Sequence, residues 1–126
     1  MSRVTHFEIQ AFNPRRAIEF YESTFGWEFE QWKDWEYWTI ETGHEDDPGI
    51  NGGLIKRDGK IEGKGIVSFV CTIDVDDIDE TLEDVVENGG WVAVPKRAVP
   101  EIGWLAYIKD TESNIIGVLE ADPRAL

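Results

Sequence analysis

The chain has 126 residues, of which 26 are acidic and 12 are basic, so its formal net charge is −14. This charge argues against nucleic acids and anionic membranes as partners, because both are bound by clusters of lysine and arginine. No segment is long and apolar enough to cross a bilayer, and the N-terminus lacks the apolar core of a signal peptide, so we expect a soluble, cytoplasmic protein.

The first half of the chain predicts a strand, a helix and three further strands. The stretch RVTHFEIQA alternates apolar and polar residues, which predicts a strand over 3–11. Asn13 suits the N-cap of a helix, Pro14 its first turn and Gly26 its C-terminal cap, so a helix is predicted between them. Three more strands are predicted in WEFEQWK, WEYWTIET and INGGLIKR.

After the glycine-rich connector DGKIEGKG, the same order of elements begins again. GIVSFVCTIDV predicts a strand, and DDIDETLEDVVENGG predicts a helix whose first acidic residues complement the helix dipole. Strands are then predicted in WVAVPKRA, GWLAYIKD and NIIGVLEA. Cys71 is the only cysteine and lies in the apolar run IVSFVCTI, so we expect it to be buried. A disulfide within the chain and a cysteine-based metal cluster are excluded.

The two halves match each other at a constant offset. Gly26-Trp27 corresponds to Gly90-Trp91 and Gly53-Leu54 to Gly117-Val118, and both pairs are 64 residues apart. A constant offset that runs through helix, turn and last strand indicates an internal duplication. We therefore predict an α+β fold in which one domain, residues 1–126, contains two tandem β-α-β-β-β modules. Module one spans about 3–57 and module two about 65–121.

Three stretches carry a resemblance to a known family: HFEIQAFNPRRAIEFYESTFGW, TIDVDDIDETLEDVVENGG and VPEIGWLAYIKDTESNIIGVLEAD. Their order and spacing resemble those of the vicinal oxygen chelate superfamily, which includes glyoxalase I, extradiol dioxygenases and the bleomycin-resistance proteins. The resemblance covers roughly residues 3 to 121, with Thr111 and Ser113 in place of the proline and glycine of the usual closing pattern. It implies mixed sheets curled around a cavity and a homodimer.

The resemblance also implies that catalytic members hold one metal in that cavity, with ligands from the first and last strands of each module. On this chain the four ligand positions are His6, Gly53, Val70 and Gly117. A catalytic divalent metal needs about three protein ligands with N, O or S donors, and only His6 supplies one. We therefore expect no metal and no other cofactor. A bound divalent metal is the alternative, and Glu8 would then be a second donor.

Strand alternation predicts which side chains line the cavity. His6 and Glu8 share one face of the first strand, while Phe7 and Ile9 face the helix. Glycine at the implied ligand positions of the last strands leaves room for a ligand to approach the backbone. The predicted ligand-binding cavity is lined by His6, Glu8, Trp38, Gly53, Ser68, Val70, Trp104 and Gly117.

His6 and Glu8 allow two interpretations: an acid–base pair that acts on a carbonyl substrate, or polar groups that only satisfy hydrogen bonds. Our leading hypothesis is a metal-independent protein that binds a small organic molecule, as a sequestering or resistance-type protein or an accessory enzyme subunit. The alternative is a metal-dependent enzyme of the same superfamily, either a glyoxalase-type lyase or isomerase or a dioxygenase. A structural interaction module whose pocket is filled by its own tryptophans is a third interpretation.

Overall fold

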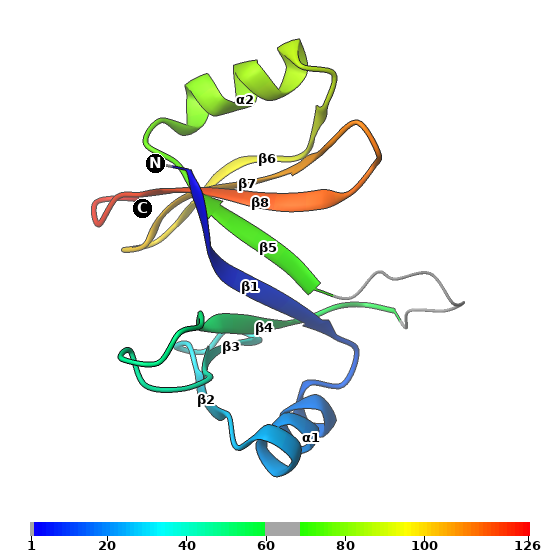
Figure 1. The fold of residues 1–126 in the computed structure, drawn as a ribbon, viewed down its shortest axis with the longest axis vertical. Helices are drawn as coiled ribbons and strands as arrows, with labels where there is room; N and C mark the ends of the chain where they lie inside the picture. The colour runs from blue at the N-terminus through cyan, green and yellow to red at the C-terminus, as the bar shows by residue number, and fades with distance from the viewer. Residues whose placement is uncertain (1, 60–68) are drawn as a thin grey trace. The chain divides into compact units, whose positions relative to one another are not determined.

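The computed structural model describes residues 2–59 and 69–126, which contain two helices and eight strands (Figure 1). Most of the predicted connector, and Ser68 from the predicted cavity lining, lie outside these described residues. The chain divides into two compact units, His6–Phe69 and a second that combines Met1–Thr5 with Val70–Leu126. Each unit is described by itself.

The unit His6–Phe69 contains one helix and a mixed sheet. Its elements are β1 (Arg3–Ala11, from His6 onward), α1 (Pro14–Phe25), β2 (Glu28–Gln31), β3 (Tyr37–Glu41) and β4 (Gly52–Lys56). The strand order is β2-β3-β4-β1. β1 runs parallel to β4, whereas β2, β3 and β4 are antiparallel to their neighbours in that series. The helix supplies the crossover that a parallel pair requires.

The other unit repeats this arrangement. Its elements are β5 (Phe69–Asp74, from Val70 onward), α2 (Ile78–Glu87), β6 (Trp91–Val99), β7 (Gly103–Lys109) and β8 (Ile115–Ala121). The strand order is β5-β8-β7-β6, with β5 parallel to β8 and the other pairs antiparallel. The prediction of an α+β fold with two β-α-β-β-β modules is therefore confirmed.

The strand register confirms the internal repeat. In the first module Glu8 lies opposite Gly53, and in the second Thr72 lies opposite Gly117. Residue 72 follows residue 8 by 64, and residue 117 follows residue 53 by the same number. The offset read from the sequence thus corresponds to equivalent positions in two parallel strand pairs.

Side-chain and backbone caps define the helix ends. The Asn13 side chain accepts a hydrogen bond from the Arg16 amide at 3.2 Å, and Gly26 adopts a left-handed conformation with φ of 73°. Asp77 caps α2 by accepting from the Glu80 amide at 3.1 Å. α2 carries acidic residues in its first turn and no basic residue in its last. Neither helix within 2–59 and 69–126 is long and apolar enough to span a membrane.

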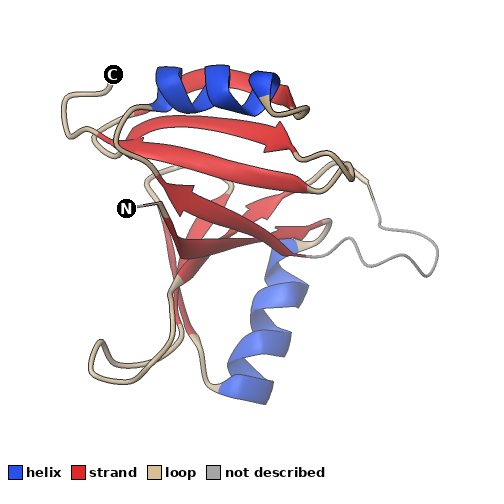
Figure 2. Cartoon of the chain, turned by 45° about the horizontal axis from the view of Figure 1, so that its top comes forward, coloured by secondary structure: helices blue, strands red, loops and turns tan. Residues whose placement is uncertain are grey.

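Each helix covers one face of its own sheet, as the blue helices in Figure 2 show. In the unit His6–Phe69 the helix-side core is centred on Leu54, which is fully buried, and on Ile40, and α1 adds Ile18 and Tyr21 to it. In the other unit α2 contributes Ile78 to a core that also contains Val75, Ala106, Ile108 and Val118. Both cores follow the predicted alternation of apolar residues.

The expectation that Cys71 is buried is wrong, because its side chain is exposed. α2 packs mainly on β6, β7 and β8. On β5, Ile73 packs against the α2 core, while Phe69 and Cys71 are exposed. The apolar run around Cys71 therefore extends beyond the part of the sheet that α2 covers.

Leu54→Ala should lower the free energy of unfolding by about 2–5 kcal/mol, because it opens a cavity in a fully buried position. Ile50→Ala is a control in the same unit at a side chain that is 38% exposed, and should cost about 1 kcal/mol or less. Urea unfolding monitored by circular dichroism measures both values. Equal losses in the two variants would contradict the assignment of Leu54 to the core.

Candidate functional site

Three polar residues of β1 lie on the face of the sheet away from α1. Phe7 and Ile9 belong to the helix-side core, so the alternating residues His6, Glu8 and Gln10 lie on the opposite face. The Gln10 side-chain amide donates a hydrogen bond to the Glu8 carboxylate at 2.8 Å. The predicted facing of His6 and Glu8 is therefore confirmed.

Tyr37 joins these residues from β3. Its hydroxyl oxygen lies 3.4 Å from Nε2 of His6, and can donate to that nitrogen in the tautomer that carries its proton on Nδ1. Tyr37 also lies over Gly53 of β4, so a Cβ atom at Gly53 would collide with the tyrosine ring and hydroxyl. We call His6, Glu8, Gln10 and Tyr37 the polar face.

Burial determines the charge states on the polar face. Glu8 is only 6% exposed, and every buried side-chain nitrogen or oxygen atom in the described chain has a hydrogen-bond partner. Burial lowers the pKa of His6 from its usual 6.5, so the imidazole is uncharged at neutral pH. Burial, and then the charge of Glu8, raise the pKa of Tyr37 to about 12. Tyr37 is therefore a hydroxyl donor beside a neutral imidazole.

The second module has the same backbone arrangement with different chemistry. Val70 and Thr72 are buried on β5, and Tyr107 of β7 lies opposite Gly117. A Cβ atom at Gly117 would lie 3.2 Å from the Thr72 hydroxyl and 3.5 Å from the Tyr107 ring. In each module a tyrosine from the neighbouring antiparallel strand therefore lies against the glycine of the last strand.

The expectation that Trp38 and Trp104 share a face with the polar residues is wrong. Trp38 packs against the helix-side core of the unit His6–Phe69, and Trp104 packs against the core beneath α2. The Trp104 indole donates to Asp122 at 3.2 Å, and the Lys96 ammonium lies 5.1 Å from its ring centre. Adjacent residues of a strand point to opposite faces of the sheet, and at β3 it is Tyr37, and not its neighbour Trp38, that lies on the polar face.

A signal for Tyr37 was present in the sequence. Along β3 the apolar residues Trp38 and Ile40 alternate with Tyr37, Thr39 and Glu41. Consistent alternation would have assigned the two apolar residues to the helix side and Tyr37 to the other face.

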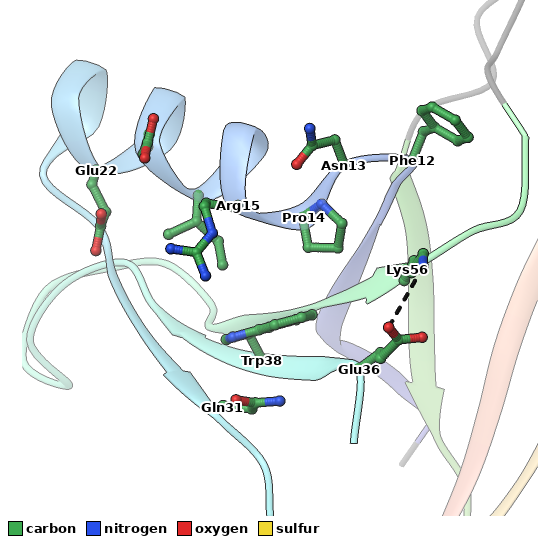
Figure 3. Close-up of a pocket in the computed structure, with 11 residues that line it drawn as sticks. Phe12, Asn13, Pro14, Arg15, Glu22, Gln31, Glu36, Trp38 and Lys56 are labelled. Atoms are coloured by element: carbon green, nitrogen blue, oxygen red, sulfur yellow. Dashed lines mark ion pairs between the residues drawn. The ribbon is translucent and has the colours of Figure 1, made fainter. Parts of the chain in front are cut away.

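Trp38 lines a groove on the other face of the sheet, beside α1. The groove has a volume of about 660 Å³, and its walls carry Glu19, Glu22 and Glu36 together with Arg15 and Lys56. Figure 3 shows Trp38 between α1 and Gln31, and the ion pair of 3.6 Å between Lys56 and Glu36. We call this hollow the Trp38 groove.

The residues at the implied ligand positions do not fit a divalent metal. Of the two implied ligand positions in the unit His6–Phe69, only His6 carries a donor atom in its side chain. At the other position, Gly53, the space for a side chain is filled by Tyr37. In the other unit, Val70 and Gly117 have no donor atoms in their side chains. Glu120, which lies near Gly117 on the last strand, does not supply a metal ligand there, because its carboxylate accepts a hydrogen bond from the Ile78 amide at 2.9 Å. Residues 2–59 and 69–126 contain no group of three or more histidine, cysteine or acidic residues that could hold a metal.

A sequence model of the Glyoxalase/Bleomycin resistance protein/Dioxygenase superfamily matches residues 3–116. The chain therefore belongs to this superfamily, and the resemblance inferred from its motifs is confirmed.

Two curated relatives, both named "Putative glyoxylase CFP32", come from Mycobacterium bovis and Mycobacterium tuberculosis. Each is 23% identical to this chain over 130 residues, and the alignment covers 91% of this chain and 44% of the relative. The chain thus spans less than half the length of the curated relatives that it matches.

Solved structures share the fold. Methylmalonyl-CoA epimerase from Mycobacterium tuberculosis aligns with a TM-score of 0.65 and 18% identity, over 95% of this chain and 88% of that one. A methylmalonyl-CoA epimerase in complex with methylmalonyl-CoA and NH4+ aligns with a TM-score of 0.66 and 14% identity, over 99% and 98%. The protein BH1468 from Bacillus halodurans aligns with a TM-score of 0.64 and 14% identity, over 99% of this chain and 98% of that one.

Gly53→Ala should displace Tyr37 and separate its hydroxyl from His6, since the new methyl group would occupy the position of the tyrosine. We expect a loss of about 1–3 kcal/mol in unfolding free energy, as for other overpacked sites. Gly43→Ala is the matched control, because a Cβ atom there meets nothing within 4 Å. Similar stability in both variants would refute the packing of Tyr37 over Gly53.

Because burial lowers the pKa of His6, the unfolded chain takes up a proton more readily than the folded protein does. Stability should therefore decrease as the pH falls below the usual value of 6.5. His44→Gln leaves His6 as the single histidine, and its NMR signals should titrate below that value. Urea unfolding at about pH 7 and about pH 5 should show a smaller loss in His6→Gln than in the parent. An equal loss would contradict this linkage.

Proposed function

We propose that the polar face binds a small organic molecule without the help of a divalent metal. The observation that carries this proposal is the position of Tyr37, whose hydroxyl fills the space in which a side chain at Gly53 would begin. At Gly53, where the family resemblance implies a metal ligand, this chain therefore places the neutral hydroxyl of Tyr37. The remaining implied positions add one imidazole, at His6, which is too few donors to hold a metal.

The protonation states of Tyr37 and His6 favour a ligand that presents an oxygen atom as a hydrogen-bond acceptor. Tyr37 stays protonated because its pKa is about 12. When His6 carries its proton on Nε2, that N–H donates to the Tyr37 oxygen and leaves the one tyrosine proton for a carbonyl or carboxylate oxygen of the ligand. His6 is neutral and offers one donor and one acceptor nitrogen. Glu8 accepts a hydrogen bond from the Gln10 amide and lies close enough to Tyr37 to raise the pKa of its hydroxyl.

Methylmalonyl-CoA is a suitable first probe, since it carries a thioester carbonyl and a carboxylate and is the ligand of a protein with a similar fold. Pyruvate offers a ketone and a carboxylate without the CoA group. Both can be added to untagged protein purified without chelators, while the His6 NMR signals are followed in the His44→Gln background. Elemental analysis of the same sample measures the metal content.

We expect far less than one equivalent of divalent metal, and binding of at least one probe that EDTA does not alter. Tyr37→Phe should weaken that binding by about tenfold, because it removes one hydrogen bond and keeps the ring over Gly53. Tyr21→Phe is the matched control, as it removes a hydroxyl from the helix-side core. A stoichiometric metal that is lost in His6→Ala would overturn the proposal in favour of a metal-dependent enzyme.

A further inference from the structure

A second groove follows the side of α1 that faces β1. It has a volume of about 530 Å³, within the range of about 300–1,000 Å³ that is usual for small-molecule sites. Ile9 and Ala11 of β1 line it, and both belong to the helix-side core. The groove therefore lies on the face of the sheet opposite the polar face. We call it the Arg57 groove.

The charge of the Arg57 groove is opposite to that of the chain as a whole. Its described lining contains two arginines, Arg16 and Arg57, and no acidic residue. The Trp38 groove on the other side of the same helix is instead lined by three glutamates. In a chain with a net charge of −14, a groove whose described lining holds two guanidinium groups and no carboxylate has a local positive field.

Arg57 is fixed in place by the backbone. Its Nη1 donates to the Gln10 carbonyl oxygen at 2.7 Å, and its Nε donates to the carbonyl oxygen of Gly59. A guanidinium has five N–H donors, so these two bonds leave three for other partners. No carboxylate of residues 2–59 and 69–126 forms an ion pair with Arg57 or with Arg16. An anion that binds here meets a preoriented guanidinium with no carboxylate to displace.

Aromatic side chains form the rest of the groove wall. Phe12 and Phe20 are 40% and 55% exposed, and the Tyr21 ring packs edge-on against Phe20 with ring centres 5.2 Å apart. Exposed aromatic rings next to guanidinium groups suit a ligand that is flat and apolar at one end and anionic at the other.

We propose that the Arg57 groove binds an organic anion with a flat apolar group. Arg16 and Arg57 receive the anionic end, and Phe12 and Phe20 contact the apolar end. Gln10 of the polar face also contributes to the lining of this groove. The two arginines and two phenylalanines that carry this proposal are not part of the polar face, so either proposal can fail without the other.

Isothermal titration calorimetry with three naphthalene derivatives tests the proposal. 2-Naphthoate and 2-naphthyl phosphate should bind saturably, and their relative affinities show whether the groove prefers a carboxylate or a phosphate. The neutral 2-naphthalenemethanol should bind at least about tenfold more weakly, because it lacks the charge that pairs with the arginines. Equal binding of the neutral compound, or no saturable binding of either anion, would overturn the proposal.

Neighbouring arginines provide matched variants. Arg16→Gln and Arg57→Gln should each weaken anion binding by about tenfold. Arg15→Gln makes the same change of charge one residue away, in the Trp38 groove, and should stay within about twofold of the parent. Arg16 is exposed and its side chain has no partner in the described chain, so this variant keeps the fold even if Arg57→Gln does not. An equal loss in Arg15→Gln and Arg16→Gln would show that net charge, and not this groove, attracts the anion.

Discussion

The parallel pairing of β1 with β4 determines which side chains meet on the polar face. It sets Glu8 opposite Gly53, and the antiparallel pairing of β3 with β4 brings the Tyr37 ring diagonally across that glycine. Because Gly53 has no side chain, the tyrosine hydroxyl reaches His6 and lies in the field of Glu8. The backbone register and the absence of one methyl group therefore control both the hydrogen bonding and the pKa values at this face.

The second module keeps that register but not its ionisable groups. Thr72 stands where the first module has Glu8, and Val70 stands where it has His6. Tyr107 lies opposite Gly117 directly, whereas Tyr37 reaches Gly53 from a position two residues away along its strand. The duplication has thus preserved the hydrogen-bonded framework, while acid–base groups are concentrated in one module.

The sequence was sufficient to predict the order of elements, the two caps of α1 and the facing of β1, because these depend on local signals such as Asn13, Gly26 and strict alternation. It did not identify Tyr37, because adjacent aromatic residues obscure the parity of β3. It also failed at Cys71, where an apolar run extends past the area that α2 covers. The Arg57 groove combines residues from β1 and α1 with Arg57, which follows β4, and only the folded arrangement of those segments brings them together.

The acidic character of α2 has a consequence for the response of the protein to its solvent. Acidic residues at the start of the helix favour it through the helix dipole, but those in its last turn are opposed by the same dipole and repel one another. No basic residue in that turn offsets the repulsion. Dissolved ions shorten the range of such repulsion to about 3 Å at 1 M. Dissolved counterions therefore favour this helix by screening the repulsion, and dilute buffer is the condition under which its last turn is weakest.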